Sequence, residues 1–227
     1  MPAVELYSYA ACPFAQRTRM VLAEKAIDYE LHEVDLANRP ANWHEISPTG
    51  KVPLLRHNGA TVYESTIINQ YLDEVFTEPP LMPDTPLGRA QARIWMDHCD
   101  HRFLPVMHNL MWQSDGEDKR LASLDKALEA LHELENRGLA ESGAGPYWFG
   151  ERPSLVDFQY LPFFERLPVY KELCGLDWPV DCARLNTWFE AMCARDSVRP
   201  TLRSADEHLA QQRRLIERIS AARKSAA

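Results

Sequence analysis

The chain has 227 residues, a net charge of −8 and 45% hydrophobic residues. This length is enough to bury a large core in one or two domains. The acidic balance argues against nucleic acid and anionic membrane surfaces as partners, because both carry negative charge. The apolar runs are too short to cross a bilayer, and the N-terminal residues lack the basic and apolar regions of a secretory signal.

The cysteines are five in number and widely spaced: Cys12, Cys99, Cys174, Cys182 and Cys193. An odd, scattered set in a chain of this size favours reduced thiols over a disulfide framework. We therefore expect a cytoplasmic protein.

The pattern of apolar and turn residues in positions 1–76 predicts an α/β domain. Candidate strands cover residues 4–9, 28–34, 52–55 and 60–63, and the last two are joined by Asn58-Gly59, a strong hairpin signal. Candidate helices begin at Phe14, near Trp43 and at Ile67, the last with apolar residues at helical spacing up to Phe76. The order βαβ, a short helix, then ββα is that of a thioredoxin-like domain.

The sequence after residue 76 contains patterns of helices and of a linker, but none of strands. Residues 77–86 contain four prolines and few apolar residues, so we expect an interdomain linker there. From residue 87 to residue 227 apolar residues recur at helical spacing, as in the leucine stripe from Leu121 to Leu134. Ser154 and Asp157 have the spacing of a capping box at the start of a buried helix. We expect an all-α helical-bundle domain over residues 87–227.

Cys12 stands directly after the first candidate strand and directly before a helix. Pro13 suits the first helical position, where a missing N–H costs nothing. The unpaired N–H groups and the positive dipole end of a helix favour an anion, so we expect a lowered pKa for the Cys12 thiol. A dithiol oxidoreductase has a second cysteine three positions later, where this chain has Ala15. The pattern predicts a single-thiol nucleophile whose mixed disulfides are resolved by an external thiol.

Several short motifs occur together in one order along the chain. They are residues 12–17 (Cys-Pro-Phe-Ala-Gln-Arg), 38–40 (Asn-Arg-Pro), 50–53 (Gly-Lys-Val-Pro), 64–65 (Glu-Ser) and the capping motif at 154–157. With these motifs the sequence resembles the cytosolic glutathione transferase superfamily over nearly its whole length. The similarity is greatest to the Cys-type members, namely the omega, lambda and dehydroascorbate-reductase-like proteins.

The resemblance implies a glutathione site. Ser65, at a helix start, is expected to bind the γ-glutamyl carboxylate, and Glu64 the α-ammonium group. A cis peptide bond before Pro53 is implied, with the backbone of Val52 pairing with the cysteinyl part of glutathione as if adding a strand. Arg39 is expected to hold the glycyl carboxylate. The whole expected glutathione-binding set is Phe14, Arg39, Lys51, Val52, Pro53, Glu64 and Ser65.

The function that the resemblance implies is a glutathione-dependent thiol transferase or reductase. Cys12 forms a mixed disulfide with glutathione and acts on glutathionylated substrates, dehydroascorbate or small conjugates. An alternative is the conjugation of glutathione to electrophiles, which requires a hydroxyl group that stabilises the glutathione thiolate without a covalent bond. Tyr7, Ser8 and Tyr9 lie close enough to Cys12 in the sequence to keep that alternative open.

A second alternative is a binding protein. Residues 22–25, 71–74 and 79–83 resemble stringent starvation protein A, a relative of the same fold that binds RNA polymerase. That relative lacks the Cys-Pro-Phe motif, which this chain has, so the enzyme is favoured. Members of the superfamily are usually homodimers, and the resemblance implies the same here.

The long helix after the linker raises two further questions. In the family this helix covers the first domain, so Trp95, His98, Arg102 and Trp112 are candidates for a second-substrate pocket. Residues 97–101 (Asp-His-Cys-Asp-His) are rich in metal-ligating types. At helical spacing residues 97, 98 and 101 share a face while Cys99 points away, and no partner cluster is evident, so we expect no metal site.

Overall fold

The computed structural model describes residues 4–112, 116–140 and 145–225, with side chains described up to residue 221. Its sheet has four strands in the order β2-β1-β3-β4. These are β1 (Val4–Ser8), β2 (Glu30–Glu33), β3 (Leu54–His57) and β4 (Ala60–Tyr63). Strand β1 runs parallel to β2 and antiparallel to β3, and β3 and β4 form the hairpin that Asn58-Gly59 predicts.

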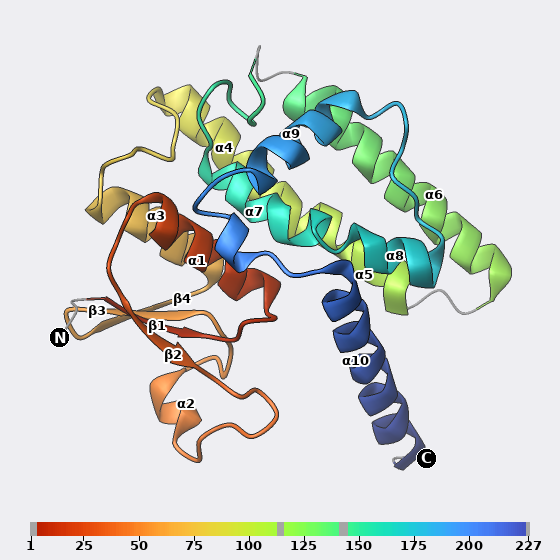
Figure 1. The fold of residues 1–227 in the computed structure, drawn as a ribbon, viewed down its shortest axis with the longest axis horizontal. Helices are drawn as coiled ribbons and strands as arrows, with labels where there is room; N and C mark the ends of the chain where they lie inside the picture. Colours follow the sequence, from red (N-terminus) through yellow and green to blue (C-terminus); the bar gives the residue numbers. More distant parts are fainter. Residues whose placement is uncertain (1–3, 113–115, 141–144, 226–227) are drawn as a thin grey trace.

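Helices cover both faces of this sheet (Figure 1). On one face lie α1 (Pro13–Glu24) and α3 (Ser65–Val75), which pack on Leu6 and Leu55. On the other lies the short helix α2 (Trp43–Ile46), whose buried Trp43 donates its indole N–H to the Gly50 carbonyl at 3.0 Å. The domain is thioredoxin-like, as the order of elements predicts.

The rest of the described chain is almost entirely helical. Its helices are α4 (Pro86–His98), α5 (Leu104–Trp112), α6 (Glu117–Glu133), α7 (Leu155–Phe164), α8 (Leu167–Cys174), α9 (Ala183–Cys193) and α10 (Ala205–Ser225). A π-helical turn, Cys99–Phe103, joins α4 to α5, and another, Leu134–Leu139, continues α6. A 3-10 turn, Arg199–Thr201, lies between α9 and α10. The fold class expected from the sequence is confirmed.

Helix α7 is the centre of the helical domain, and all ten of its residues are buried. It begins with the expected capping box: Asp157 accepts hydrogen bonds from the backbone N–H of Ser154 at 2.6 Å and from its hydroxyl at 2.7 Å. The same carboxylate accepts from the indole N–H of Trp188 on α9 at 2.8 Å. One carboxylate therefore fixes the direction of α7, which packs against α1 and α4.

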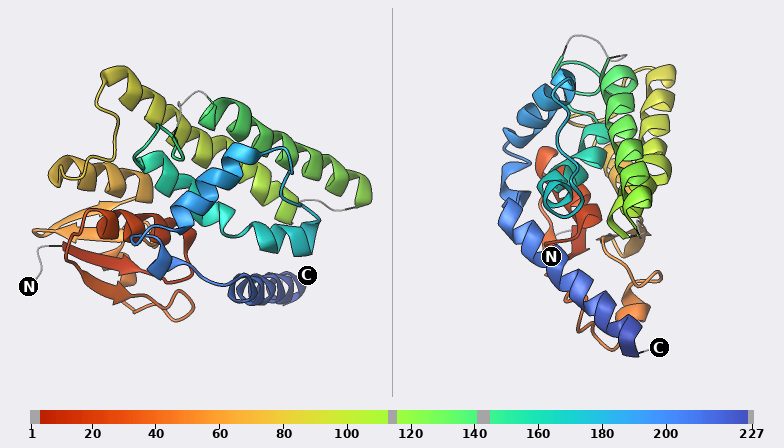
Figure 2. Two further views of the ribbon diagram at one scale, coloured as in Figure 1. Left: turned by 45° about the horizontal axis from the view of Figure 1, so that its top comes forward. Right: turned by 90° about the vertical axis from the view of Figure 1, so that its right-hand side faces the viewer.

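Helix α10 projects from the helical domain on the side of the β2–α2 connection (Figures 1 and 2). Its start is held by His208, whose ring nitrogen lies 2.8 Å from a carboxylate oxygen of Glu165. In the described parts of the chain, no helix combines the length and apolar character needed to span a bilayer. All five cysteines are free thiols, as their odd number and wide spacing together predict.

Candidate functional site

Cys12 is the N-cap residue of α1, and Pro13 follows at the first helical position. Its thiol is half-buried and points its Sγ at the Val52 carbonyl oxygen, 3.8 Å away. The backbone N–H groups of Phe14 and Ala15 also interact with the sulfur. The cysteine therefore stands at a helix start, beside the loop before β3, where the sequence predicts it.

The pKa of the Cys12 thiol differs from the expectation. Burial raises this pKa above its ordinary value, and the two helix N–H groups and the cations of Arg166 and Arg19 lower it by less. The expected lowering was therefore wrong for the free protein. The helix start does favour the thiolate, but the loss of water around a half-buried sulfur outweighs that effect.

Two arginines lie near Cys12 in the site, and neither was among the site residues expected from the sequence. Arg19 donates to the Ser8 hydroxyl at 2.7 Å and so holds the end of β1 against α1. Arg166 donates to the Ala11 carbonyl at 3.2 Å, and burial lowers its pKa to about 10. Arg19 has helical spacing from Cys12, a signal that was available. Arg166 reaches the site only because α7 packs on α1, and no sequence pattern reveals that.

Two of the three candidate hydroxyls for glutathione activation, those of Ser8 and Tyr7, are hydrogen-bonded to arginines. Ser8 is fully buried and accepts the bond from Arg19. The ring of Tyr7 stacks on His32, and its hydroxyl accepts from Arg56 at 3.2 Å. Tyr9 packs in the small apolar cluster around Trp43. Of the candidate nucleophiles in this segment, Cys12 is the one positioned by the start of α1.

A cleft of about 760 Å³ lies between the thioredoxin-like domain and α4–α5. From the expected glutathione set it is lined by Phe14, Glu64 and Ser65. Its remaining lining residues are Arg17, Thr66, Ile67, Gln70, Arg93, Met96, Asp97, Asp100, His101, Leu104, Pro105 and His108. The cleft offers charges of both signs, as a zwitterionic ligand requires.

Ser65 and Glu64 stand at the start of α3. Glu64 is exposed and has a φ of 67°, and Ser65 is the first helical residue and is buried. The Ser65 hydroxyl accepts a hydrogen bond from Arg17 at 3.3 Å. A helix start with an arginine behind its first hydroxyl favours an anion.

Arg17 is fully buried and connects the two domains. Its guanidinium donates to the Gln159 carbonyl at 2.9 Å and to Asp100 at 2.8 Å, and it lies 4.9 Å from the Phe14 ring centroid. Arg17 belongs to the motif at residues 12–17, but it was not among the expected glutathione-binding residues. Its place four residues before the buried Val21, on the apolar face of α1, was the available signal, because a buried arginine needs partners.

The remaining residues of the expected glutathione set lie outside the lining of this cleft. The Val52-Pro53 peptide bond is cis, as the resemblance implies, and both residues are buried beside Cys12. Arg39 and Lys51 are exposed in the connections that precede and follow α2. The set therefore extends from α3, past Cys12, to the α2 side of the domain.

The expected second-substrate residues are not brought together at the cleft. Trp95 packs on Trp148 with ring centroids 5.4 Å apart, and the buried His98 bonds to the Tyr160 hydroxyl at 2.8 Å. Arg102 is exposed and Trp112 half-buried, and neither lines the cleft. Helix α4 and the π-helical turn after it are rotated so that Arg93, Asp97 and His101 face the cleft instead, a rotation that helical spacing alone does not determine.

The fold and the site define a thioredoxin-like domain with a half-buried cysteine at the start of its first helix, joined to a helical domain that closes a cleft. The family model "Glutathione S-transferase, N-terminal domain" matches residues 6–80, and "Glutathione S-transferase, C-terminal domain" matches residues 94–191. Glutathione S-transferase U19 of Arabidopsis thaliana is 33% identical over 83% of this chain and 84% of its own length. The chain belongs to the glutathione S-transferase family.

Two solved structures bear on the class within the family. The Tau class enzyme of mango, Mangifera indica, has a TM-score of 0.88 and 27% identity, covering 94% of this chain and 98% of its own. Glutathione transferase Omega 3C of Trametes versicolor has a TM-score of 0.82 and 26% identity, covering 96% and 93%. The superfamily is confirmed, but the comparisons do not single out the expected Cys-type classes.

Proposed function

We propose that the protein is a glutathione-dependent thiol transferase that forms a mixed disulfide between Cys12 and glutathione. The observation that supports this most is the place of the Cys12 sulfur, which interacts with the first N–H groups of α1 and has no neighbouring cysteine to resolve a disulfide. The substrates are glutathionylated thiols, dehydroascorbate or small glutathione conjugates.

Glutathione lies along the expected set in an extended form. The γ-glutamyl carboxylate binds at the start of α3, on Ser65, and Glu64 accepts the α-ammonium group. The cysteinyl backbone pairs with Val52. The glycyl carboxylate lies toward the cations on either side of α2, Arg39 and Lys51.

The reaction on a mixed disulfide has two exchanges. The Cys12 thiolate attacks the glutathione sulfur, the substrate S–S bond breaks, and the substrate leaves as a thiolate that takes a proton from water. A glutathione thiolate then attacks the Cys12–glutathione disulfide, which releases oxidised glutathione and returns Cys12. Because the Cys12 thiol points at the Val52 carbonyl, a ligand that takes this carbonyl removes one acceptor that favours the protonated thiol.

Conjugation of glutathione to electrophiles is the second candidate, supported by the named Arabidopsis relative and the Tau class structure. Conjugation needs the glutathione thiolate to be stabilised but not bonded. In that case the N–H groups at the start of α1 bind the glutathione sulfur and Cys12 stands beside it. We further propose a cytoplasmic homodimer with domains at residues 1–76 and 87–227.

The variant Cys12→Ser separates the two reactions, because it keeps the helix start and a hydroxyl but removes the thiol. The thiol transferase proposal requires glutathione-dependent reduction of a mixed disulfide to be lost while a conjugation assay keeps its activity or gains. The control is Cys193→Ser, since Cys193 is also half-buried but lies on α9. Intact thiol transfer in Cys12→Ser contradicts the mechanism. Failure to bind immobilised glutathione, with RNA polymerase co-purifying, supports the regulator instead.

A further inference from the structure

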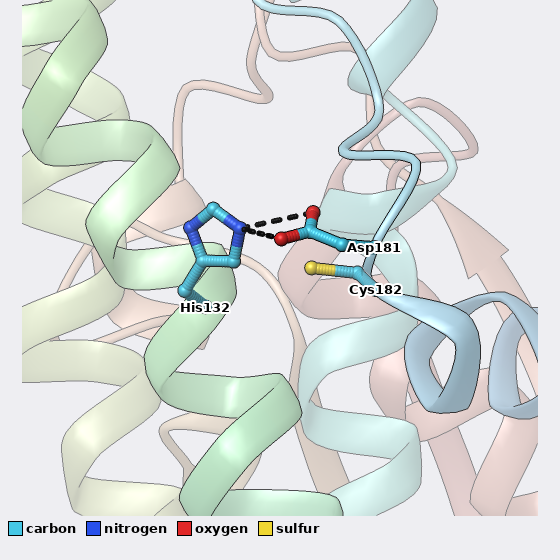
Figure 3. A group of neighbouring side chains, drawn as sticks. All are labelled: His132, Asp181 and Cys182. Atoms are coloured by element: carbon cyan, nitrogen blue, oxygen red, sulfur yellow. Dashed lines mark hydrogen bonds and ion pairs between the residues drawn. The ribbon is translucent and has the colours of Figure 1, made fainter.

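Three potential metal ligands meet between α6 and the segment that precedes α9 (Figure 3). The Nε2 atom of His132 lies 3.1 Å from each carboxylate oxygen of Asp181. The Cys182 sulfur points toward the same space, and the ligand atoms of the three residues all lie within 4.8 Å of one another. A nitrogen, an oxygen and a sulfur donor therefore converge from two separate elements.

This donor set suits one metal better than others. Zinc is bound by cysteine, histidine and carboxylate ligands in a tetrahedral arrangement with bonds of about 2.0 to 2.3 Å. Two nitrogen and oxygen ligands of a tetrahedral zinc ion stand roughly 3.3 Å apart by that geometry, close to the separation of His132 and Asp181 here. The hard cations Ca²⁺ and Mg²⁺ prefer sites built of oxygen atoms alone.

The surroundings also favour a cation. Asp181 is exposed and His132 half-buried, so an ion has a path from solvent, and Cys182 forms the buried floor of the group. The Glu135 carboxylate adds negative charge beside Cys182. The Glu135 carboxylate is held in place without a metal ion, because it already accepts the backbone N–H of Leu185 at 2.8 Å.

We propose that His132, Asp181 and Cys182 bind a zinc ion that ties α6 to the start of α9, with its fourth position open to water. On binding, the Cys182 S–H proton passes to solvent and a zinc–sulfur bond forms, while the ring proton that His132 Nε2 directs at Asp181 moves to Nδ1 through solvent, so that Nε2 binds the metal. The site lies between α6 and the start of α9, in the helical domain and away from the sheet and α1 (Figure 1), and it does not rest on the proposed reaction.

The chain offers a matched control for this site. His101 and Asp97 also form an ion pair, with a ring nitrogen 2.9 Å from a carboxylate oxygen, and both are exposed. In the described parts of the chain, no cysteine joins this pair in a group of ligand atoms. It therefore has the histidine and the carboxylate of the proposed site without the sulfur.

Reduced protein freed of metal with a chelator is titrated with Zn²⁺ in a calorimeter. We expect about one ion per chain in the wild type and in His101→Ala. His132→Ala and Cys182→Ser should each weaken binding at least about tenfold. Circular dichroism with chelator present checks that each variant is folded. Where Cys182→Ser fails to fold, His132→Ala and Asp181→Asn make the same test.

Co²⁺ then identifies the sulfur ligand. A cobalt–thiolate bond produces a charge-transfer band in the near ultraviolet, which should appear in the wild type and in Cys12→Ser but not in Cys182→Ser. The proposal is overturned when Zn²⁺ binds equally well to His132→Ala, when no binding is detected, or when the cobalt band disappears with Cys12 instead of Cys182.

Discussion

Two cysteines of this chain hold the same local position but have different neighbours. Cys12 is the N-cap residue of α1, and Cys182 is the N-cap residue of α9. Burial raises the pKa of both thiols, that of Cys182 to about 11. At Cys12 two helix N–H groups and two arginines oppose the effect of burial. The start of α1 therefore supplies donors and positive charge to the Cys12 sulfur, although burial has the larger effect on its pKa.

At the start of α9 the backbone N–H groups bond to a carboxylate and not to the cysteine sulfur. The Glu135 carboxylate accepts the backbone N–H groups of Arg184 and Leu185, so these donors are not available to the Cys182 sulfur. The carboxylates of Glu135 and Asp181 act with burial to raise the pKa of Cys182. A helix start supplies hydrogen-bond donors, but the tertiary neighbours decide which group accepts from them.

The largest expected difference between the two cysteines is in activity. Cys12→Ser should lower kcat/KM for glutathione-dependent reduction of a mixed disulfide by at least about 10³-fold, because a serine hydroxyl is a far weaker nucleophile than a thiolate. Cys182→Ser should stay within about threefold of the wild type, since its thiol lies outside the reaction. Equal losses of kcat/KM in the two variants would contradict the different roles given to the two cysteines.

The second difference is in chemical reactivity. Native protein treated with iodoacetamide should be modified at Cys12 at least about 10²-fold faster than at Cys182, which is fully buried. Because the pKa of Cys12 is raised, its thiolate is scarce at pH 7, and its rate should rise about tenfold per pH unit up to that pKa. Peptide mass spectrometry over time measures both rates. A Cys12 rate that is level from pH 6 to pH 8 would show a lowered pKa instead.

The role of Glu135 can be tested through stability. Glu135→Ala removes the group that caps α9 and should lower the free energy of unfolding by about 1–2 kcal/mol. Denaturation in urea without metal measures the change. The control is Glu129→Ala, since Glu129 is exposed on α6. An unchanged midpoint in Glu135→Ala would mean that the cap contributes nothing.

The smallest effect is expected from Arg166, which is far from Cys12 in the sequence but near it in the fold. Arg166→Gln removes a cation that lowers the pKa of Cys12, so this pKa should rise further. A rise of half a unit slows alkylation of Cys12 by about threefold at pH 7.5. Arg213→Gln, on the exposed face of α10, is the matched control. A faster reaction in Arg166→Gln would contradict the assigned electrostatic effect.

Local patterns in the sequence determined much of this protein. The order of strands and helices gave the thioredoxin-like and helical folds, because both depend on apolar periodicity and turn residues that lie close together in the chain. Cys12 at a helix start, Glu64 and Ser65 at another, and the capping box of Asp157 are also local features. The site roles assigned to these residues, and the division at residues 77–86, stay predictions.

Only the tertiary structure decided how these features act. The pKa of Cys12 depends on burial and on Arg166, which α7 brings from far along the chain. The rotation of α4 and the π-helical turn after it directs Asp97 and His101, not Trp95, to the cleft. The sequence predicted no metal site, either at residues 97–101 or elsewhere, and only the structure brings His132 together with Asp181 and Cys182. Spacing along a helix fixes which residues share a face, whereas packing fixes what that face meets.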